Sequence, residues 1–563
     1  MENSPATAGT PTGQNDGKKR RARLIVIAIV VVLAVAGALT WALLARPSAQ
    51  PPVTPSQVPS PSPEPTDALQ FERPNDWSDY RPAFHLTPEQ NWMNDPQRPF
   101  LLDGVWHYYY LYNADYPNGN GTEWYHVTST DLVHWKDEGV AIEKYTNGLG
   151  DIETGSAVVD VDNTAGFGAG AVIAIMTQQA DGIQRQSLFY STDGGYSFTA
   201  YEANPVMENP GTTDFRDPKI IWDAAHEGWV MVLAEGAKVG FYTSPDLIEW
   251  TYVSGFERDD LGTLECPDLF QMSVDGDPAN TRWVLAASAH GSKYDKTTGL
   301  AYWTGTWDGT TFTPDREEPQ WLDDGADFYA AVTWDDPSVS ADERLASRYV
   351  IGWLNNWGYA GDLPTTDWKG GMFSIVRTIR LVDVDGVATL VSQPVDALNE
   401  LDGEATVAET TVLPPGDSDS LPQPDTGSYR LQVALSPEEA DPAREVRLKL
   451  KDGGGHFATV GYDFELQRVF IARDTDAAAA TMPDLYREVR GVSSPLRDGV
   501  VTLDIFVDYA SVEVFADGGR QTLSSLAFGE PDANGFRVES VDGSTVVESL
   551  TLTPLAVAAP ERQ

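Results

Sequence analysis

The chain contains a single cysteine, Cys266, and only seven histidines among its 563 residues. With one cysteine, no intramolecular disulfide can form, so the fold must be stabilised by buried apolar side chains. The histidines are scattered and show no pair with the spacing of metal ligands. We therefore expect no metal ion and no other cofactor. Cys266 has no evident histidine partner, which favours a small buried residue over a nucleophile.

Basic residues are also scarce. The chain has 38 lysines and arginines and 84 aspartates and glutamates, which gives a formal net charge of −46. Binding of nucleic acid requires a basic surface, so this charge argues against that class of partner and against polyanionic substrates. It is compatible with a soluble domain that acts on a neutral polymer outside the cell. An apolar content of 41% and 17 tryptophans can supply the cores of two or three domains.

Only one long apolar run is present, Leu24 to Ala45, and it follows a basic tail, residues 1–23. At a rise of 1.5 Å per residue it would extend about 33 Å, enough to span the ~30 Å hydrocarbon core. Secretory signals have a shorter apolar region of about 7–15 residues, so the run favours an uncleaved transmembrane anchor over a cleaved signal. The basic tail should remain cytoplasmic, which places the rest outside the cell. Residues 46–79 are rich in proline and serine and predict an extended linker.

From residue 80 to residue 394 the sequence predicts short strands and turns, with a weak internal repeat. A run with aspartate near its start and an aromatic residue at its end recurs at residues 129–135, 191–198, 244–250 and 306–312. Its aspartates, Asp131, Asp193, Asp246 and Asp308, are 62, 53 and 62 residues apart. All-β content with such a period is typical of propeller blades, and about 315 residues accommodate roughly five of them.

The C-terminal part has a different pattern. Residues 395–426 are expected to be a connector, because the stretch after residue 408 is rich in Pro, Asp and Ser. From residue 427 to residue 557, polar and apolar residues alternate with period two, as in Tyr429 to Leu435 and Val501 to Val507. This pattern predicts an antiparallel β-sandwich in which one face of each sheet is buried.

Three acids stand in short, compact settings. Asp95 lies in Asn-Trp-Met-Asn-Asp-Pro, Asp217 in Phe-Arg-Asp-Pro-Lys, and Glu265 in Glu-Cys-Pro-Asp. An Asp-Pro pair alone is typical of a turn. However, each acid precedes the turn of a different repeat, so the three would converge if the early strands of each blade line a central channel. Glycoside hydrolysis usually requires two carboxyl groups that flank the scissile bond.

The three motifs resemble the signatures of glycoside hydrolase family 32, the β-fructosidases, which include invertases, inulinases and levanases. The resemblance covers roughly residues 80–555. Further matching runs are His134-Trp135, Gly155 to Val158, Asp327 to Ala330 and Ser511 to Phe515. It implies a five-bladed β-propeller followed by a C-terminal β-sandwich.

The resemblance also implies the role of each acid. Asp95 would be the nucleophile, Glu265 the acid and base, and Asp217 the residue that stabilises the transition state. Such a retaining reaction places the two reacting carboxyl groups about 5–5.5 Å apart. The predicted sugar-binding residues are Trp92, Asn94, Gln97, Ser156, Arg216, Asp327 and Trp357.

The sequence departs from the family pattern at three places. A glutamine that is usual after the strand following Asp95 is replaced near Leu111. Gln97-Arg98-Pro99 stands where the family usually has Asn-Gly, and Glu153-Thr154 stands where it has an aromatic residue and serine. The Gln-Arg-Pro run is similar to relatives that act on levan, so levan is the first expected substrate, with inulin and sucrose as further possibilities. A levan fructotransferase and a levanbiose-releasing levanase are the alternatives within the family. A surface carbohydrate-binding protein without activity is the alternative from another class, and the presence of all three acids argues against it.

Overall fold

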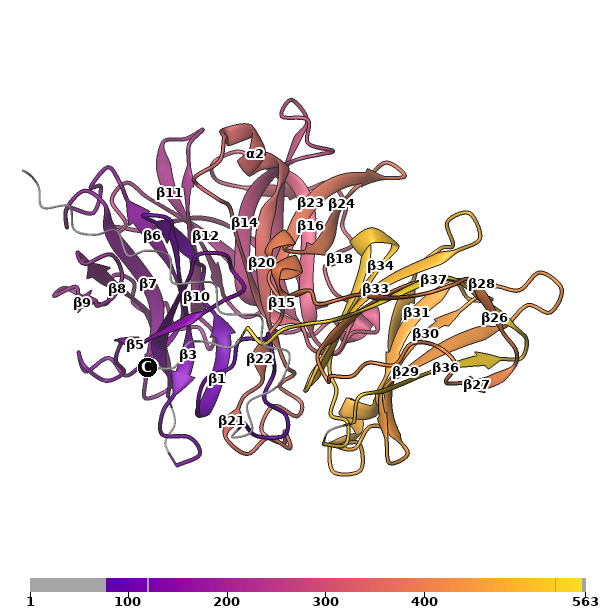
Figure 1. The fold of residues 1–563 in the computed structure, drawn as a ribbon. Coiled ribbons are helices and arrows are strands. Elements are labelled where there is room, and N and C mark those ends of the chain that lie inside the picture. The colour runs from indigo at the N-terminus through magenta and orange to yellow at the C-terminus, as the bar shows by residue number, and fades with distance from the viewer. Residues whose placement is uncertain (1–76, 119–120, 532, 559–563) are drawn as a thin grey trace, which may run out of the picture. The chain divides into compact units, whose positions relative to one another are not determined.

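The computed structural model describes residues 77–118, 121–531 and 533–558. Within these ranges the fold is almost entirely β (Figure 1), with one short α-helix, α2 (Ala341–Ala346), and four short 3-10 turns. This confirms the predicted all-β class. None of the described helices has the length and apolar character needed to cross a bilayer. The predicted anchor, Leu24–Ala45, lies outside the described residues.

The strands from β1 to β24 form five sheets, which we call blades I to V. Blade I contains β1 (Asn91–Pro96), β2 (Phe100–Leu102), β3 (Val105–Asn113), β4 (Glu123–Ser129), β5 (Lys136–Ile142) and β21 (Trp368–Lys369). Blade II contains β6 (Asp151–Asp160), β7 (Ala171–Ala180), β8 (Ile183–Ser191) and β9 (Thr199–Ala200). Blade III contains β10 (Arg216–Asp223), β11 (Gly228–Ala234), β12 (Lys238–Ser244) and β13 (Thr251–Glu257).

Blades IV and V complete the set. Blade IV contains β14 (Glu265–Ser273), β15 (Thr281–Ala289), β16 (Gly299–Trp307), β17 (Phe312–Pro314) and β18 (Gln320–Trp321). Blade V contains β19 (Tyr329–Trp334), β20 (Arg348–Leu354), β22 (Met372–Phe373), β23 (Arg377–Val384) and β24 (Val387–Pro394). Strand β6 contacts blade I, β6 contacts β10, β10 contacts β14, β14 contacts β19, and β19 contacts β1. The five blades therefore form a closed ring, as in a propeller.

The repeated aspartates hold equivalent turns in four blades. Asp131 accepts hydrogen bonds from the backbone N–H groups of the second and third residues after it, both at 2.8 Å. Asp246 and Asp308 do the same, and Asp193 accepts from the third and fourth residues after it. An aspartate that caps the backbone in this way is a turn former. The internal repeat thus marks the turn that leads to the outer strand of each of these blades.

Each of the five first strands carries a break in its pairing register near its start. The breaks lie between Asn94 and Pro96, Ile152 and Gly155, Arg216 and Lys219, Glu265 and Asp268, and Tyr329 and Val332. Such β-bulges leave a residue unpaired and re-aim its side chain. In three strands the bulge includes a non-glycine residue with positive φ, namely Asp217, Cys266 and Ala330.

The remaining strands form two facing sheets. One contains β25 (Thr406–Ala408), β26 (Thr411–Leu413), β28 (Tyr429–Pro437), β33 (Val501–Asp508), β34 (Ser511–Ala516), β35 (Gln521–Leu526) and β37 (Thr545–Pro554). The other contains β27 (Gly416–Ser418), β29 (Glu445–Gly453), β30 (His456–Asp463), β31 (Arg468–Ala472), β32 (Arg490–Ser493) and β36 (Gly535–Val541). Apolar residues of both sheets share one core. The stretch expected as a connector is more ordered than predicted, because β25, β26 and β27 pair with sandwich strands.

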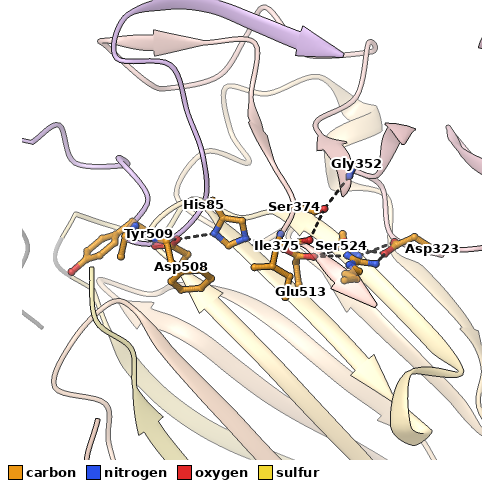
Figure 2. A network of polar contacts seen from close by, with 12 residues as sticks. His85, Asp323, Gly352, Ser374, Ile375, Asp508, Tyr509, Glu513 and Ser524 are labelled. Atoms are coloured by element: carbon orange, nitrogen blue, oxygen red, sulfur yellow. Dashed lines mark hydrogen bonds and ion pairs between the residues drawn. The ribbon is translucent and has the colours of Figure 1, made fainter. Parts of the chain in front are cut away.

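A buried network of charges joins the two β-regions (Figure 2). The imidazole of His85, just before blade I, contacts Asp508 at 2.7 Å and Glu513 at 2.8 Å. Glu513 also pairs with Arg377 of blade V, which contacts Asp323 at 2.9 Å. All five side chains are fully buried. The network therefore attaches β33 and β34 of the sandwich to the propeller through charges that have no access to water.

This network predicts that stability depends on pH through His85. Although burial alone would lower it, contact with Asp508 and Glu513 raises the pKa of His85 from 6.5 to about 9. The stabilisation is therefore complete below pH 6.5 and is lost as the pH rises through about 9. We expect His85→Gln to lower the free energy of unfolding by roughly 3 kcal/mol more at pH 6 than at pH 10. Denaturant unfolding at both pH values measures this, and an equal loss at the two values would contradict a charged His85.

Candidate active site

Asp95 lies in the bulge of β1 and is held on three sides. The hydroxyl of Thr154 donates to Oδ2 at 2.6 Å, and the amide of Asn94 donates to Oδ1 at 3.1 Å. The side chain of Gln97 donates to the Asp95 carbonyl at 2.9 Å, and the indole of Trp92 orients Asn94 at 2.9 Å. Burial raises the pKa of Asp95, whereas the two donors to its carboxyl group lower it. The carboxylate is thus fixed in orientation, as an attacking group must be.

Asp217 lies in the bulge of β10, with a φ of 62°. Its own N–H donates to Thr177 Oγ1 at 3.0 Å, and its Oδ2 accepts from the N–H of Cys266 at 3.0 Å. Burial raises the pKa of Asp217 to about 7, and the neighbouring carboxylates act in the same direction while Arg216 opposes them. Left-handed backbone at a non-glycine residue is uncommon and is concentrated at functional sites.

Glu265 opens β14 and is held between two blades. Arg216 donates to its Oε1 from Nη2 at 3.0 Å and from Nε at 3.3 Å. The hydroxyl of Tyr329, from blade V, donates to Oε2 at 2.5 Å. Arg216 also lies 3.9 Å from Asp217. Burial opposes the charge of Arg216, but the two carboxylates raise its pKa above the usual range.

Cys266 marks the point where the acids converge. Its sulfur lies 3.7 Å from Oδ2 of Asp95 and 3.8 Å from Oδ2 of Asp217, and it directly follows Glu265. Cys266 is buried, and burial raises the pKa of its thiol well above the usual value. A neutral thiol is a poor nucleophile. The raised pKa supports the interpretation of Cys266 as a small buried neighbour of Glu265. The contacts of Cys266 also show that Asp95, Asp217 and Glu265 lie close together.

Four of the predicted sugar-binding residues lie in or beside this cluster. Asn94 and Arg216 contact the acids directly. Trp92 stacks on Trp357 with ring centroids 6.3 Å apart, and it also contacts Tyr116 at 4.9 Å. Trp357 is 45% exposed. These rings form an aromatic wall beside Asp95, and a role in sugar binding remains a prediction for all four residues.

Gln97 and Ser156 do not fit the predicted direct contact with sugar. Both are fully buried. Gln97 accepts a hydrogen bond from Gly155 N at 2.7 Å in addition to holding the backbone of β1. The hydroxyl of Ser156 donates to Pro218 O at 3.0 Å and accepts from Ile220 N at 2.9 Å. These side chains therefore fasten β6 to its neighbouring blades, which positions the residues that face the channel.

Asp327 likewise does not fit the predicted direct contact with sugar, because its side chain is buried. Its carboxylate is fully buried, pairs with Arg473 at 2.5 Å and accepts from Leu526 N at 2.8 Å. Tyr359 donates to its other oxygen at 2.5 Å. Arg473 and Leu526 belong to the sandwich region, so Asp327 links that region to blade V. Its place in a family-like run reflects this structural contact.

Glu153 and Tyr329 belong to the site but were not predicted as site residues. The carbonyl of Glu153 accepts from the indole of Trp124 at 3.0 Å. Its carboxyl group has no hydrogen-bond partner among the described residues, and burial together with the nearby charges of Asp151, Asp217 and Asp95 raises its pKa to about 8. In the sequence, the departure from the family pattern at Glu153 could have indicated that this residue belongs to the site. Tyr329 could have been found from its position in the family-like run Asp327 to Ala330.

Arg216 is the cation that lies among these carboxyl groups, so its removal should change the pH profile. Without the guanidinium, the pKa of Asp217 rises further, and the ionised form is present only at higher pH. For Arg216→Met we expect the acidic limb of kcat/KM to move to higher pH by roughly one pH unit, which lowers the activity at pH 6 about tenfold. Initial rates between pH 4.5 and 9 measure this. A profile that keeps its shape at a lower rate would show that Arg216 affects only substrate binding.

A pair of fixed carboxyl groups with a third acid and a cation, at the centre of a ring of β-blades, defines a glycosidase site. Residues 85–394 match the glycosyl hydrolases family 32 N-terminal domain, and residues 397–554 match the glycosyl hydrolases family 32 C terminal. The chain therefore belongs to glycosyl hydrolase family 32.

Individual relatives agree with this assignment. The chain is 45% identical over 480 residues to a levanbiose-producing levanase of Bacillus subtilis, covering 84% of this chain and 90% of the relative. It is 49% identical over 394 residues to a levanbiose-producing levanase of Geobacillus stearothermophilus, covering 69% and 96%. Among solved structures, the exo-inulinase of Aspergillus awamori matches with a TM-score of 0.76 and 30% identity, covering 87% of this chain and all of that one. The protein is accordingly a fructan-hydrolysing glycosidase.

Proposed function

We propose that the protein hydrolyses levan with retention of configuration at the anomeric carbon. The observation that supports this most directly is the convergence of Asp95, Asp217 and Glu265 around Cys266, with Arg216 between the last two acids. Asp95 and Asp217 lie in the bulges of blades I and III, and Glu265 directly precedes the bulge of blade IV. The names of the levanase relatives favour levan over inulin and sucrose.

In the first step, the carboxylate of Asp95 attacks C2 of a fructosyl unit while Glu265 transfers its proton to the departing glycosidic oxygen. The C2–O bond to the leaving sugar breaks, and an ester forms between C2 and Asp95. In the second step, Glu265 removes a proton from water, whose oxygen attacks C2 and releases Asp95. Arg216 and Tyr329 hold the two oxygens of Glu265 throughout. Asp217 binds ring hydroxyls, and such bonds accelerate the reaction if they strengthen in the transition state.

Release of a disaccharide is the second candidate, and it is favoured by the levanbiose-producing relatives and by the departures at Gln97 and Glu153. Both of these departures from the family pattern lie where the end of β1 meets β6. The side chain of Gln97 accepts a hydrogen bond from Gly155 N, and the hydroxyl of Thr154, next to Glu153, donates to Asp95. Transfer to a sugar hydroxyl in place of water is the remaining alternative within the family.

The deciding experiment incubates the full chain in detergent with levan, inulin and sucrose. NMR during the first minutes reports the configuration of the newly formed anomeric centre. The proposal predicts hydrolysis with a preference for levan and an initial product with the β-configuration of the substrate. An initial α-product would contradict the double displacement. A cyclic or elongated product would indicate a transferase, and no reaction with any substrate would favour the binding-protein alternative.

We also propose that residues 24–45 anchor the protein in the cell membrane, with the catalytic part outside the cell. The support comes from the sequence: a basic cluster precedes an apolar run long enough to span a bilayer. Extraction of a membrane fraction with carbonate and then with detergent tests it. Release by carbonate alone, or a mature N-terminus beyond residue 45, would contradict an uncleaved anchor.

A further inference from the structure

A recess of about 420 Å³ lies beside the start of β6, where blades I and II meet. Its lining includes Tyr145, Asp151, Gln179 and Asp181. These residues come from the loop between β5 and β6, from β6 itself, and from the β7–β8 turn. The recess falls within the range of about 300–1,000 Å³ that is usual for small-molecule sites, and it combines an exposed aromatic ring with several polar groups.

The walls of this recess are held in place by the fold. Gly150 has a φ of 105°, and a Cβ there would lie 1.8 Å from the carbonyl oxygen of Gln179, so only glycine allows the loop to approach β7 this closely. The N–H of Tyr145 donates to Gly150 O at 2.8 Å. The amides of Asn147 and Gln178 form two mutual hydrogen bonds, at 2.8 and 3.0 Å. The loop and the blade edge thus form a fixed polar surface.

The position of the recess in the ring relates it to the reaction. Glu265, the group that protonates the leaving oxygen, belongs to blade IV. In a five-membered ring, the boundary between blades I and II lies opposite blade IV. The recess is therefore on the far side of the channel from the leaving group, next to the blades that supply Asp95 and Thr154.

Glu153 connects the recess to the reaction centre. It lies on β6 between Asp151, which lines the recess, and Thr154, which donates to Asp95 at 2.6 Å. The indole of Trp124, from blade I, fixes its backbone. Because the carboxyl group has no hydrogen-bond partner among the described residues, its polar atoms can bind a ligand in the channel. Glu153 is partly exposed, so a ligand can reach this carboxyl group.

We infer that Glu153 and this recess form a subsite for a second fructosyl unit, on the side of the scissile bond that stays with the nucleophile. The inference depends on the proposed levan hydrolysis and extends it. An enzyme that releases a disaccharide must hold two sugar rings on that side of the bond. One ring occupies the reaction centre at Asp95, and the next lies between Glu153 and the exposed ring of Tyr145. The protein therefore cuts levan after every second unit from the chain end.

Two variants test the subsite. Glu153→Ala removes the connecting carboxyl group, and Tyr145→Gly removes the aromatic ring while tolerating the φ of 64° at that position. For each, we expect the ratio of disaccharide to fructose released from levan to fall at least tenfold. The ratio of kcat/KM on levan to that on sucrose, which has one fructosyl ring, should fall by a similar factor. The matched control is Tyr252→Gly, which removes a tyrosine of similar exposure, 50% against 55%, on the outer strand of blade III.

A binding experiment separates failure of the subsite from failure of the proposed hydrolysis. In Asp95→Asn, a levan-derived disaccharide should bind at least tenfold more tightly than fructose by calorimetry, and Asp95→Asn with Glu153→Ala should lose this difference. Equal affinities would overturn the subsite whether or not the protein is an enzyme. Release of fructose alone from levan by the unmodified protein would also overturn it, while the proposed hydrolysis would stand. If both variants lowered kcat/KM on levan and on sucrose by the same factor, Glu153 would contact the fructosyl ring at the reaction centre instead of the second ring.

Discussion

Replacement of Asp95 by asparagine is expected to reduce kcat on levan by about 10⁴-fold or more, because the amide cannot form the covalent intermediate. The substitution is nearly isosteric. Thr154 and Asn94 can still form hydrogen bonds with the side chain, so the site should keep its shape. Initial rates of sugar release, measured at equal concentrations of folded protein, give the ratio.

The control for this variant is Glu227→Gln, a substitution of an exposed acid in the β10–β11 turn. The kcat of this variant should stay within about twofold of that of the unmodified protein. A substitution at an exposed position away from the core and the active site usually has little effect. If Asp95→Asn kept more than one hundredth of the activity, another group would have to act as nucleophile. Asp217 would then be the next acid to replace, because it shares contact with the Cys266 sulfur.

The second large effect concerns stability. Arg377→Met should lower the free energy of unfolding by about 3–5 kcal/mol, because it leaves Asp323 and Glu513 buried with one cation fewer. Arg377 is fully buried, and it contacts both carboxylates as well as the ring face of Phe328 at 4.4 Å. Chemical denaturation at pH 6, where His85 is still charged, measures the loss.

The chain offers a matched control on the same strand. Arg380 lies three residues further along β23, is exposed, and contacts Gln393 at 3.1 Å. Arg380→Met should change the free energy of unfolding by no more than about 0.5 kcal/mol. Similar losses for the two variants would mean that the charge network contributes no more than a surface contact.

The ring of blades and the three acids could be predicted from the sequence because local chemistry encodes them. An aspartate that caps a turn must be near its turn, so the spacing of Asp131, Asp193, Asp246 and Asp308 records the blades directly. The acids stand in short runs beside proline and apolar residues, and these runs are visible without knowledge of the fold. Alternation with period two was sufficient for the sandwich, where Tyr429 to Leu435 are buried at alternate positions.

The surroundings of the acids could not be predicted in the same way. Thr154 and Tyr329 reach their partners across blade boundaries, through bulges that have no sequence signature. Membership in a family-like run did not distinguish residues that face the channel from those that support it. Ser156 and Asp327 were predicted to bind sugar for that reason, but their side chains are occupied by other parts of the protein.

The five bulges also bear on how such a site can change over evolutionary time. Asp95, Glu153 and Asp217 lie inside the breaks of blades I, II and III and have no partner in the strand register, so their replacement leaves the paired residues of those blades intact. Each of these three blades therefore offers a position where a new side chain can be tried without refolding the sheet behind it. In blades IV and V the side chains that reach the site, Glu265 and Tyr329, belong to the last paired residues before the break. The residues inside those two breaks, Cys266 and Ala330, are buried in the apolar core, so change at the centre of the ring is easier in the first three blades than in the last two.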